Sequence, residues 1–167
     1  MRIYIVGFPG SGKTTLLKHL AKRLHYQGLD MDQLLEQKFS MSVRDYFAQY
    51  GQASFREQEH LLLQETLQWD NAVIATGGGT PCFYRNMQWM NTHGITLYLE
   101  MNAKALFSRL QNAKDRRPLL SQETDLLQYI EQTLAERAPY YESAIIKVNG
   151  LNVNADEVVK QLKQYLP

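Results

Sequence analysis

The residues best suited to chemistry lie near the start of the chain, in a short glycine-rich segment. Its sequence is Gly7-Phe8-Pro9-Gly10-Ser11-Gly12-Lys13-Thr14. Glycines allow a tight backbone turn whose N–H groups converge on a phosphate. Lys13 could reach the β- and γ-phosphates of a nucleotide, and the Thr14 hydroxyl could ligate Mg²⁺. An apolar strand-like run precedes the segment and a helical leucine pattern follows it, which is the context that a phosphate-binding loop requires.

A second candidate group is the acidic pair Asp30 and Asp32, which follows a short apolar piece. Side chains two residues apart in an extended chain point the same way, so both carboxylates would face one site. One could hold a Mg²⁺-bound water while the other accepts a substrate hydroxyl. A turn or a helix N-cap is the alternative, because aspartate is favoured at both. Beside a phosphate loop, we favour the functional interpretation.

A run of three glycines, Gly77 to Gly79, follows the apolar segment 72–75 after a single threonine, Thr76. Consecutive glycines lose much backbone entropy on folding, so some other feature must compensate for them. At the end of a strand, the usual reason is close approach of the backbone to a ligand. A flexible turn is the alternative, and it explains this position poorly.

Three arginines could bind or neutralise anionic groups. Arg56 and Glu59 are i,i+3 neighbours in a helical pattern, and from this feature alone we favour a surface ion pair of little energetic weight. Arg117 lies in a polar stretch, where it could close over a nucleotide and stabilise a transferring phosphoryl group, or simply be solvated. Arg137 ends the next helical run, where a cation also interacts well with the helix C-terminus.

Alternating strand-like and helical runs must position these residues. The segments with strand character are 2–6, 28–30, 73–75, 95–99 and 145–148. Helical patterns between them predict a three-layer α/β/α fold with a five-stranded parallel sheet covered on both faces. Ligands in such sheets bind beyond the carboxyl ends of the strands. Residues 31–60 form a helical excursion and 111–122 a polar connection, which are the kinds of segment that become substrate sites and lids.

Two short motifs predict helix boundaries within this framework. Ser42-x-x-Asp45 resembles a capping box, opening a helix that should stop near Gly51. Asn154-x-x-Glu157 predicts the start of the last helix in the same way.

The composition limits the partners that we expect. The 167 residues suit a single domain spanning 1–167, and 18 basic residues nearly balance 17 acidic ones. No charge excess therefore indicates binding to nucleic acid or to an anionic membrane. Cys82 is the single cysteine and is best read as a small, partly buried filler. We expect a cytoplasmic protein without a targeting segment or membrane span, and a monomer.

Taken together in order and spacing, these motifs resemble the shikimate kinase family. The matching motifs are the phosphate loop, Asp30-Met31-Asp32, Phe55-Arg56-x-x-Glu59, Gly77-Gly78-Gly79, Arg117-Pro118-Leu119-Leu120 and Arg137-x-x-Tyr140. The resemblance implies a P-loop kinase fold like that of nucleoside-monophosphate kinases, with strand order 2-3-1-4-5. It also implies a substrate-binding region at about 31–60, a mobile lid at about 110–122, and transfer of the γ-phosphoryl group of ATP to the 3-hydroxyl of shikimate with Mg²⁺ as cofactor.

The resemblance further implies a role for each matched residue. The catalytic set would be Lys13, Asp32 and Arg117. The ATP-binding set would be Gly10, Ser11, Gly12, Lys13, Thr14, Thr15, Arg109 and Arg117. Shikimate would be bound by Asp32, Arg56, Gly77, Gly78, Gly79 and Arg137. Thr14 would ligate Mg²⁺ directly and Asp30 through water.

The chain departs from the family pattern in three places. The 149–154 loop lacks the arginine and proline often found beside the adenine, the 109–116 segment contains no glycine, and residues 40–52 match only loosely. None of these differences removes a group that the chemistry needs.

Three alternative functions use similar parts. A gluconate kinase would also pair a phosphate loop with arginines against a carboxylate, but the triple glycine and the Phe55-Arg56-x-x-Glu59 motif argue against it. A nucleoside-monophosphate kinase calls for more arginines at its acceptor site. A non-catalytic P-loop module is disfavoured by the intact Lys13, Asp32 and Arg117.

Overall fold

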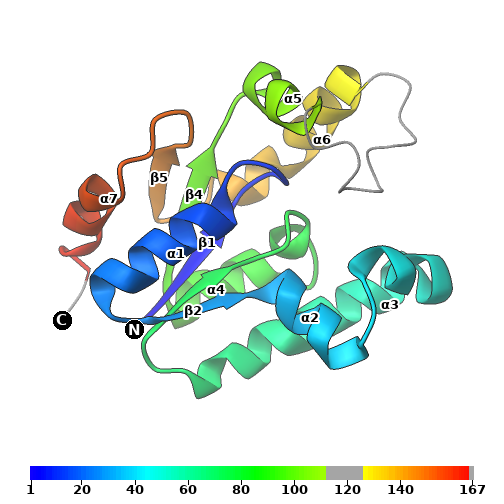
Figure 1. The fold of residues 1–167 in the computed structure, drawn as a ribbon, viewed down its shortest axis with the longest axis horizontal. Coiled ribbons are helices and arrows are strands. Elements are labelled where there is room, and N and C mark those ends of the chain that lie inside the picture. Colours follow the sequence, from blue (N-terminus) through cyan, green and yellow to red (C-terminus); the bar gives the residue numbers. More distant parts are fainter. Residues whose placement is uncertain (112–125, 166–167) are drawn as a thin grey trace.

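The computed structural model describes residues 1–111 and 126–165, which form one parallel five-stranded sheet with helices on both faces (Figure 1). The strand order is β2-β3-β1-β4-β5, and each neighbouring pair is parallel. The strands are β1 (Arg2–Val6), β2 (Gln27–Asp30), β3 (Ala72–Ala75), β4 (Ile95–Glu100) and β5 (Ile146–Asn149). The fold class and the strand order predicted above are therefore confirmed.

Helices connect the strands and cover the sheet. They are α1 (Lys13–Leu24), α2 (Met31–Phe39), α3 (Val43–Glu65), α4 (Asn86–His93), α5 (Ala103–Gln111), α6 (Leu126–Tyr141) and α7 (Ala155–Leu162), with the 3₁₀ turns η1 (Thr66–Gln68) and η2 (Thr80–Cys82). None of the helices in the described part of the chain is long and apolar enough to cross a membrane.

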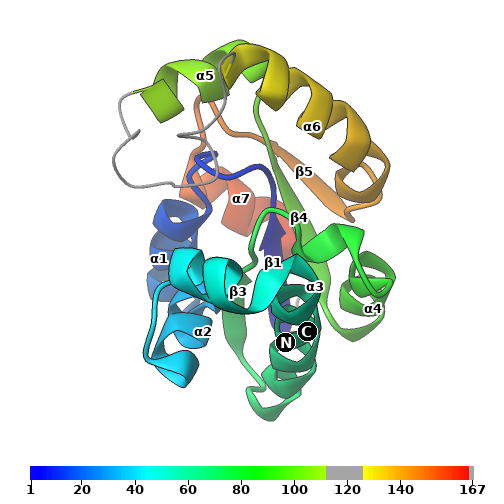
Figure 2. The same cartoon turned by 90° about the vertical axis from the view of Figure 1, so that its right-hand side faces the viewer.

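The alternation of side chains along β1 shows how the two faces are built. Ile3 and Ile5 pack with α1 and α7 in one apolar cluster, while Tyr4 and Val6 pack in a second cluster with residues of α2, α3, α4 and α6. Figure 2 shows these layers on either side of the sheet. Successive strand residues point to opposite faces, so an entirely apolar strand is what a doubly covered sheet requires.

The helical excursion predicted at 31–60 consists of α2 and α3. Ser42 caps α3 as expected, its Oγ accepting from the Asp45 N–H at 3.1 Å. The predicted stop near Gly51 appears as a break within α3, because Gly51 has φ 81° and ψ 171°. This backbone conformation favours glycine, and the chain resumes as a helix that runs to Glu65.

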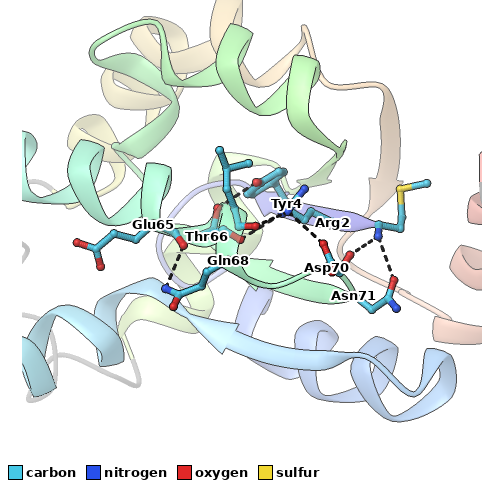
Figure 3. Close-up of polar contacts among 9 residues, drawn as sticks. Arg2, Tyr4, Glu65, Thr66, Gln68, Asp70 and Asn71 are labelled. Atoms are coloured by element: carbon cyan, nitrogen blue, oxygen red, sulfur yellow. Dashed lines mark hydrogen bonds and ion pairs between the residues drawn. The ribbon is translucent and has the colours of Figure 1, made fainter.

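The amino-terminal end of β1 is anchored by polar contacts to the segment after α3 (Figure 3). Arg2 donates from Nε to the Thr66 carbonyl at 3.2 Å and from Nη2 to the Leu67 carbonyl at 2.5 Å. The Tyr4 hydroxyl lies 3.0 Å from Thr66 Oγ1, which donates to the Leu63 carbonyl at 2.6 Å. These contacts fix the end of the sheet opposite to the carboxyl ends of the strands, so they leave those ends open for ligands.

Candidate active site

The glycine-rich segment forms the predicted loop between β1 and α1. Gly10 and Gly12 have φ values of 87° and 100°, which L side chains rarely adopt. The Ser11 N–H donates to the Phe8 carbonyl at 3.1 Å and closes the turn. Gly12 is the N-cap of α1, so the first N–H groups of the helix open onto the loop. The arrangement is a ready site for an anion.

Two polar side chains of the loop are arranged around its interior. Lys13 Nζ donates to the Gly7 carbonyl at 2.8 Å and to the Phe8 carbonyl at 3.0 Å, which folds the side chain back along the loop. Ser11 is only 1 % exposed, and its buried hydroxyl meets no hydrogen-bond partner within the described residues. A buried hydroxyl without a partner is costly, and a phosphate oxygen would supply the missing one.

The Asp30 and Asp32 pair differs from the sequence prediction. Asp30 is the N-cap of α2, its Oδ1 accepting from the N–H groups of Asp32 at 3.1 Å and Gln33 at 3.4 Å. Asp32 therefore lies in the first turn of a helix, and the two carboxylates do not project from one extended strand, because the chain turns at Met31. Asp30 nevertheless faces the phosphate loop, since its Oδ2 accepts from Thr14 Oγ1 at 2.8 Å. The capping interpretation is therefore confirmed for Asp30, and its role towards Mg²⁺ stays a prediction.

A cavity of about 220 Å³ joins these groups to the glycine run. Its lining residues are Pro9, Gly10, Gly12, Lys13, Thr14, Thr15, Asp30, Asp32, Ala75, Thr76 and Gly78. The cavity lies at the carboxyl ends of β1, β2 and β3, as expected for an open α/β sheet. It therefore brings a cation, a hydroxyl and two carboxylates to one place.

Arg56 and Glu59 form a buried ion pair, so the predicted surface pair is wrong. Arg56 is 9 % exposed and Glu59 1 %, and Arg56 Nη1 bonds to Glu59 Oε2. Glu59 Oε1 also accepts from Thr80 Oγ1 at 2.6 Å. The guanidinium lies 4.7 Å from the Phe83 ring centroid, and its Nε has no hydrogen-bond partner among the described residues. Charge held in this way is oriented by its surroundings and shielded from water.

The three glycines are explained by close approach to this pair and to its neighbours. A Cβ on Gly77 would lie 2.5 Å from Glu59 Oε1, and one on Gly79 would lie 2.5 Å from Arg56 Nη2. A Cβ on Gly78 would meet Pro9 Cδ at 2.5 Å. None of the three has a positive φ, so the requirement is steric and does not come from backbone conformation. The structure thus explains the run by close approach of the backbone to site side chains, and the approach to a ligand expected from the sequence stays a prediction.

Arg137 lies in α6, one turn before the helix ends at Tyr141, and is not a solvated cation at the helix terminus. It is half-buried, with its guanidinium 5.7 Å from the Phe8 ring centroid. Its Nη1 is buried without a hydrogen-bond partner in the described residues and lies 3.0 Å from where a Gly78 Cβ would stand. Arg56 and Arg137 therefore approach the glycine run from different helices. The half-buried Cys82 lies in η2 beside them, and burial raises the pKa of its thiol, in agreement with a filler role.

Arg109 joins the phosphate loop to the 149–154 segment. Its Nη1 donates to the Ser11 carbonyl at 3.0 Å, and its Nη2 donates to the Gly150 carbonyl at 3.3 Å. These are the two segments that the sequence associated with the nucleotide. Arg117 and the proposed lid from 112 onward lie outside the described residues.

Sequence reasoning missed two side chains of this region, Thr80 and Tyr141. Thr80 directly follows the glycine run, and that position was the only signal for its contact with Glu59. The Tyr141 hydroxyl donates to the Gly78 carbonyl at 2.6 Å. Its signal was the helical spacing of four residues from Arg137, which places both side chains on one face of α6.

The family model and several relatives that match this chain carry the same family name. A family model described as shikimate kinase matches residues 9–167. The shikimate kinase of Bacteroides fragilis is 46 % identical over 146 residues, covering 86 % of this chain and 82 % of that protein. The shikimate kinase of Parabacteroides distasonis is 38 % identical over 167 residues, covering 99 % and 96 %.

Solved structures agree with the sequence comparisons. A crystal structure of shikimate kinase from Bacteroides thetaiotaomicron superimposes with a TM-score of 0.90 at 38 % identity, covering 99 % of this chain and 97 % of that one. The Acinetobacter baumannii shikimate kinase in complex with shikimate gives a TM-score of 0.87 at 32 % identity, covering 98 % and 91 %. A deoxyadenosine kinase from M. mycoides, with a TM-score of 0.63 at 17 % identity, shares the fold alone.

Proposed function

The chain belongs to the shikimate kinase family and transfers the γ-phosphoryl group of ATP to the 3-hydroxyl of shikimate, and we propose that the cavity beside the phosphate loop is where transfer occurs. The observation that carries this placement is that one cavity is lined by both Lys13 and Asp32. Phosphoryl transfer needs mainly positioning and charge neutralisation. Lys13 on the side of the phosphates and Asp32 on the side of the accepting hydroxyl would meet that need.

The donor half would be formed by the phosphate loop. The backbone N–H groups of Gly10 to Thr15 and the Ser11 hydroxyl would surround the phosphates, and Lys13 would supply a positive charge among them. The buried, unpartnered Ser11 hydroxyl supports this role, because a phosphate oxygen would satisfy it. Arg109 would border the adenine from its position between the loop and Gly150.

The residues around Thr14 fit a magnesium ion. The Thr14 hydroxyl and the Asp30 carboxylate are hard oxygen donors 2.8 Å apart at the edge of the cavity. We propose that Thr14 ligates Mg²⁺ directly and that Asp30 holds it through water. When bound, the ion would neutralise charge on the β- and γ-phosphates. No cluster of three or more acidic, histidine or cysteine side chains occurs among the described residues, and Mg²⁺ needs none, since it commonly keeps water and phosphate ligands.

The acceptor half would be formed from α2, α3, α6 and the glycine run. Asp32 would accept the proton of the attacking 3-hydroxyl of shikimate, or orient that hydroxyl. The hydroxyl oxygen would form a bond to the γ-phosphorus while the bond between this phosphorus and the ADP oxygen breaks. Arg56 and Arg137 would bind the carboxylate of shikimate, and the backbone of Gly78 and Gly79 would contact its hydroxyls, with Gly77 beside them in the substrate-binding set. The unpartnered nitrogens of both arginines support this assignment, because a carboxylate accepts charge-assisted hydrogen bonds from guanidinium groups. Arg117 would join the site from the lid.

The direct test is coupled detection of ADP release with Mg²⁺-ATP and shikimate, gluconate or AMP as acceptor. Of the three acceptors, we expect only shikimate to be phosphorylated. Turnover with gluconate or AMP and none with shikimate would contradict the function. A monomeric state and a cytoplasmic location stay predictions.

A further inference from the structure

Tyr141 links α6 to the glycine run through a single buried hydroxyl. The residue is fully buried, and its hydroxyl donates to the Gly78 carbonyl at 2.6 Å. The Tyr98 ring stacks on the Tyr141 ring with centroids 5.1 Å apart. The ring is therefore fixed by packing, and the hydroxyl is held in one direction. Burial also raises the pKa of Tyr141, while Arg137 beside the hydroxyl opposes that rise through its charge and a hydrogen bond, so the neutral hydroxyl contacts both the Gly78 carbonyl and an arginine of the site.

The hydrogen bond to Gly78 determines where the next N–H points. Because a trans peptide is planar, the Gly78 carbonyl and the Gly79 N–H point to opposite sides of it. The Gly79 N–H is therefore directed away from Tyr141, and it meets no acceptor among the described residues. Without side chains, the peptide between two glycines has few other restraints on its rotation. The Tyr141 hydroxyl supplies one.

The location of this peptide connects it to acceptor binding. Gly78 lines the cavity that also contains Asp32. Arg137 lies one turn before Tyr141 on the same face of α6, with Nη1 close to Gly78. The peptide that Tyr141 restrains therefore lies next to the groups assigned to the acceptor.

We infer that Tyr141 is a positioning residue for the acceptor: its hydrogen bond to the Gly78 carbonyl orients the following peptide, so that the Gly79 N–H can donate to the acceptor. This role rests on the proposed acceptor half of the site. Tyr141 itself touches neither substrate nor the reacting atoms, so its effect belongs to binding of one substrate.

The test compares Tyr141→Phe with Tyr98→Phe. Both remove one hydroxyl from the same stacked pair, but within the described residues the Tyr98 hydroxyl makes no hydrogen bond. We expect Tyr141→Phe to raise the KM for shikimate by roughly five-fold, because one hydrogen bond is lost. The kcat and the KM for ATP should be unchanged. Tyr98→Phe should leave all three constants at their wild-type values. Titration calorimetry with shikimate should show the same loss of affinity in Tyr141→Phe.

A purely structural role would give a different pattern. Tyr141→Phe would then lower the unfolding temperature and the active fraction, reducing kcat without a selective change in KM. That result, or an unchanged KM for shikimate, would overturn the inference. If the wild-type protein phosphorylated another acid instead, the proposed function would fail, and the same variant pair would be compared with that acid.

Discussion

Thr14 and Asp30 are joined by a hydrogen bond of 2.8 Å between Oγ1 and Oδ2, although they belong to different strand–helix units. The other oxygen of Asp30 caps α2 by accepting from the N–H groups of Asp32 and Gln33. One carboxylate therefore connects the phosphate loop to the helix that carries Asp32. It thereby links the proposed donor half of the site to the proposed acceptor half.

Replacing Asp30 with asparagine separates the two tasks of this residue. Asparagine caps helices as well as aspartate does, so we expect the stability of Asp30→Asn to stay close to wild type. Loss of the charge should raise the Mg²⁺ concentration for half-maximal activity by about ten-fold or more. A Mg²⁺ titration at saturating ATP and shikimate measures this. The control Asp30→Ala should lose the cap as well, at about 1 kcal/mol of stability. An unchanged Mg²⁺ requirement in Asp30→Asn would exclude the metal role.

Asp32→Asn should abolish most turnover while leaving nucleotide binding intact. The asparagine keeps the size of the side chain in the first turn of α2 but cannot take a proton. General-base groups contribute about 10² to 10⁴ in rate, so we expect kcat to fall within that range. Nucleotide affinity, measured by titration, should match wild type. Weakened ATP binding together with normal kcat would place Asp32 on the donor side.

Arg56→Ala should raise the KM for shikimate far more than that for ATP, because it removes a charge-assisted contact to one substrate. It also leaves Glu59 charged and buried without its partner, which costs about 3–5 kcal/mol of stability. The double variant Arg56→Met/Glu59→Gln removes both charges and should recover most of that stability. Its KM for shikimate should remain high. If Arg56→Ala raised the KM for shikimate and the KM for ATP equally, and the double variant restored both, Arg56 would have only a structural role.

The sequence predicted those features that local backbone chemistry determines. The phosphate loop was predictable because its glycines lie between a strand and a helix, and the start of α3 because Ser42 and Asp45 have capping spacing. The burial of Arg56 and Glu59 was not, since i,i+3 spacing does not reveal that Thr80 and Gly77 cover them. The direction of Asp32 relative to Asp30 was misjudged for a similar reason. A strand end and a helix N-cap share one residue there, and only the turn at Met31 separates the two carboxylates.

Gly79→Ala tests the steric requirement of the glycine run. The new Cβ would stand 2.5 Å from Arg56 Nη2, so the guanidinium must shift. Because φ at Gly79 is −89°, alanine strains no backbone there, and the loss should appear mainly as a higher KM for shikimate. Gly51→Ala is the matched control, since its Cβ would meet nothing within 4 Å but φ is +81°. That variant should lose about 1 kcal/mol of stability without a change in KM. Unaltered shikimate kinetics in Gly79→Ala would show that Arg56 is not held at its binding position by this contact.

The buried hydroxyl of Tyr141 should limit stability at high pH. Burial raises its pKa above the ordinary value of 10.0, so above pH 10 the unfolded chain loses this proton while the folded protein keeps it. The folded state then binds more protons, and the free energy of unfolding falls by about 1.4 kcal/mol per pH unit for each such tyrosine. Tyr4 and Tyr98, whose pKa values burial also raises, add to the slope. Urea unfolding between pH 9 and 11 should therefore give a shallower decline for Tyr141→Phe than for wild type. Identical slopes would mean that Tyr141 titrates alike in both states, and the hydroxyl would then not be held as a neutral donor against Gly78.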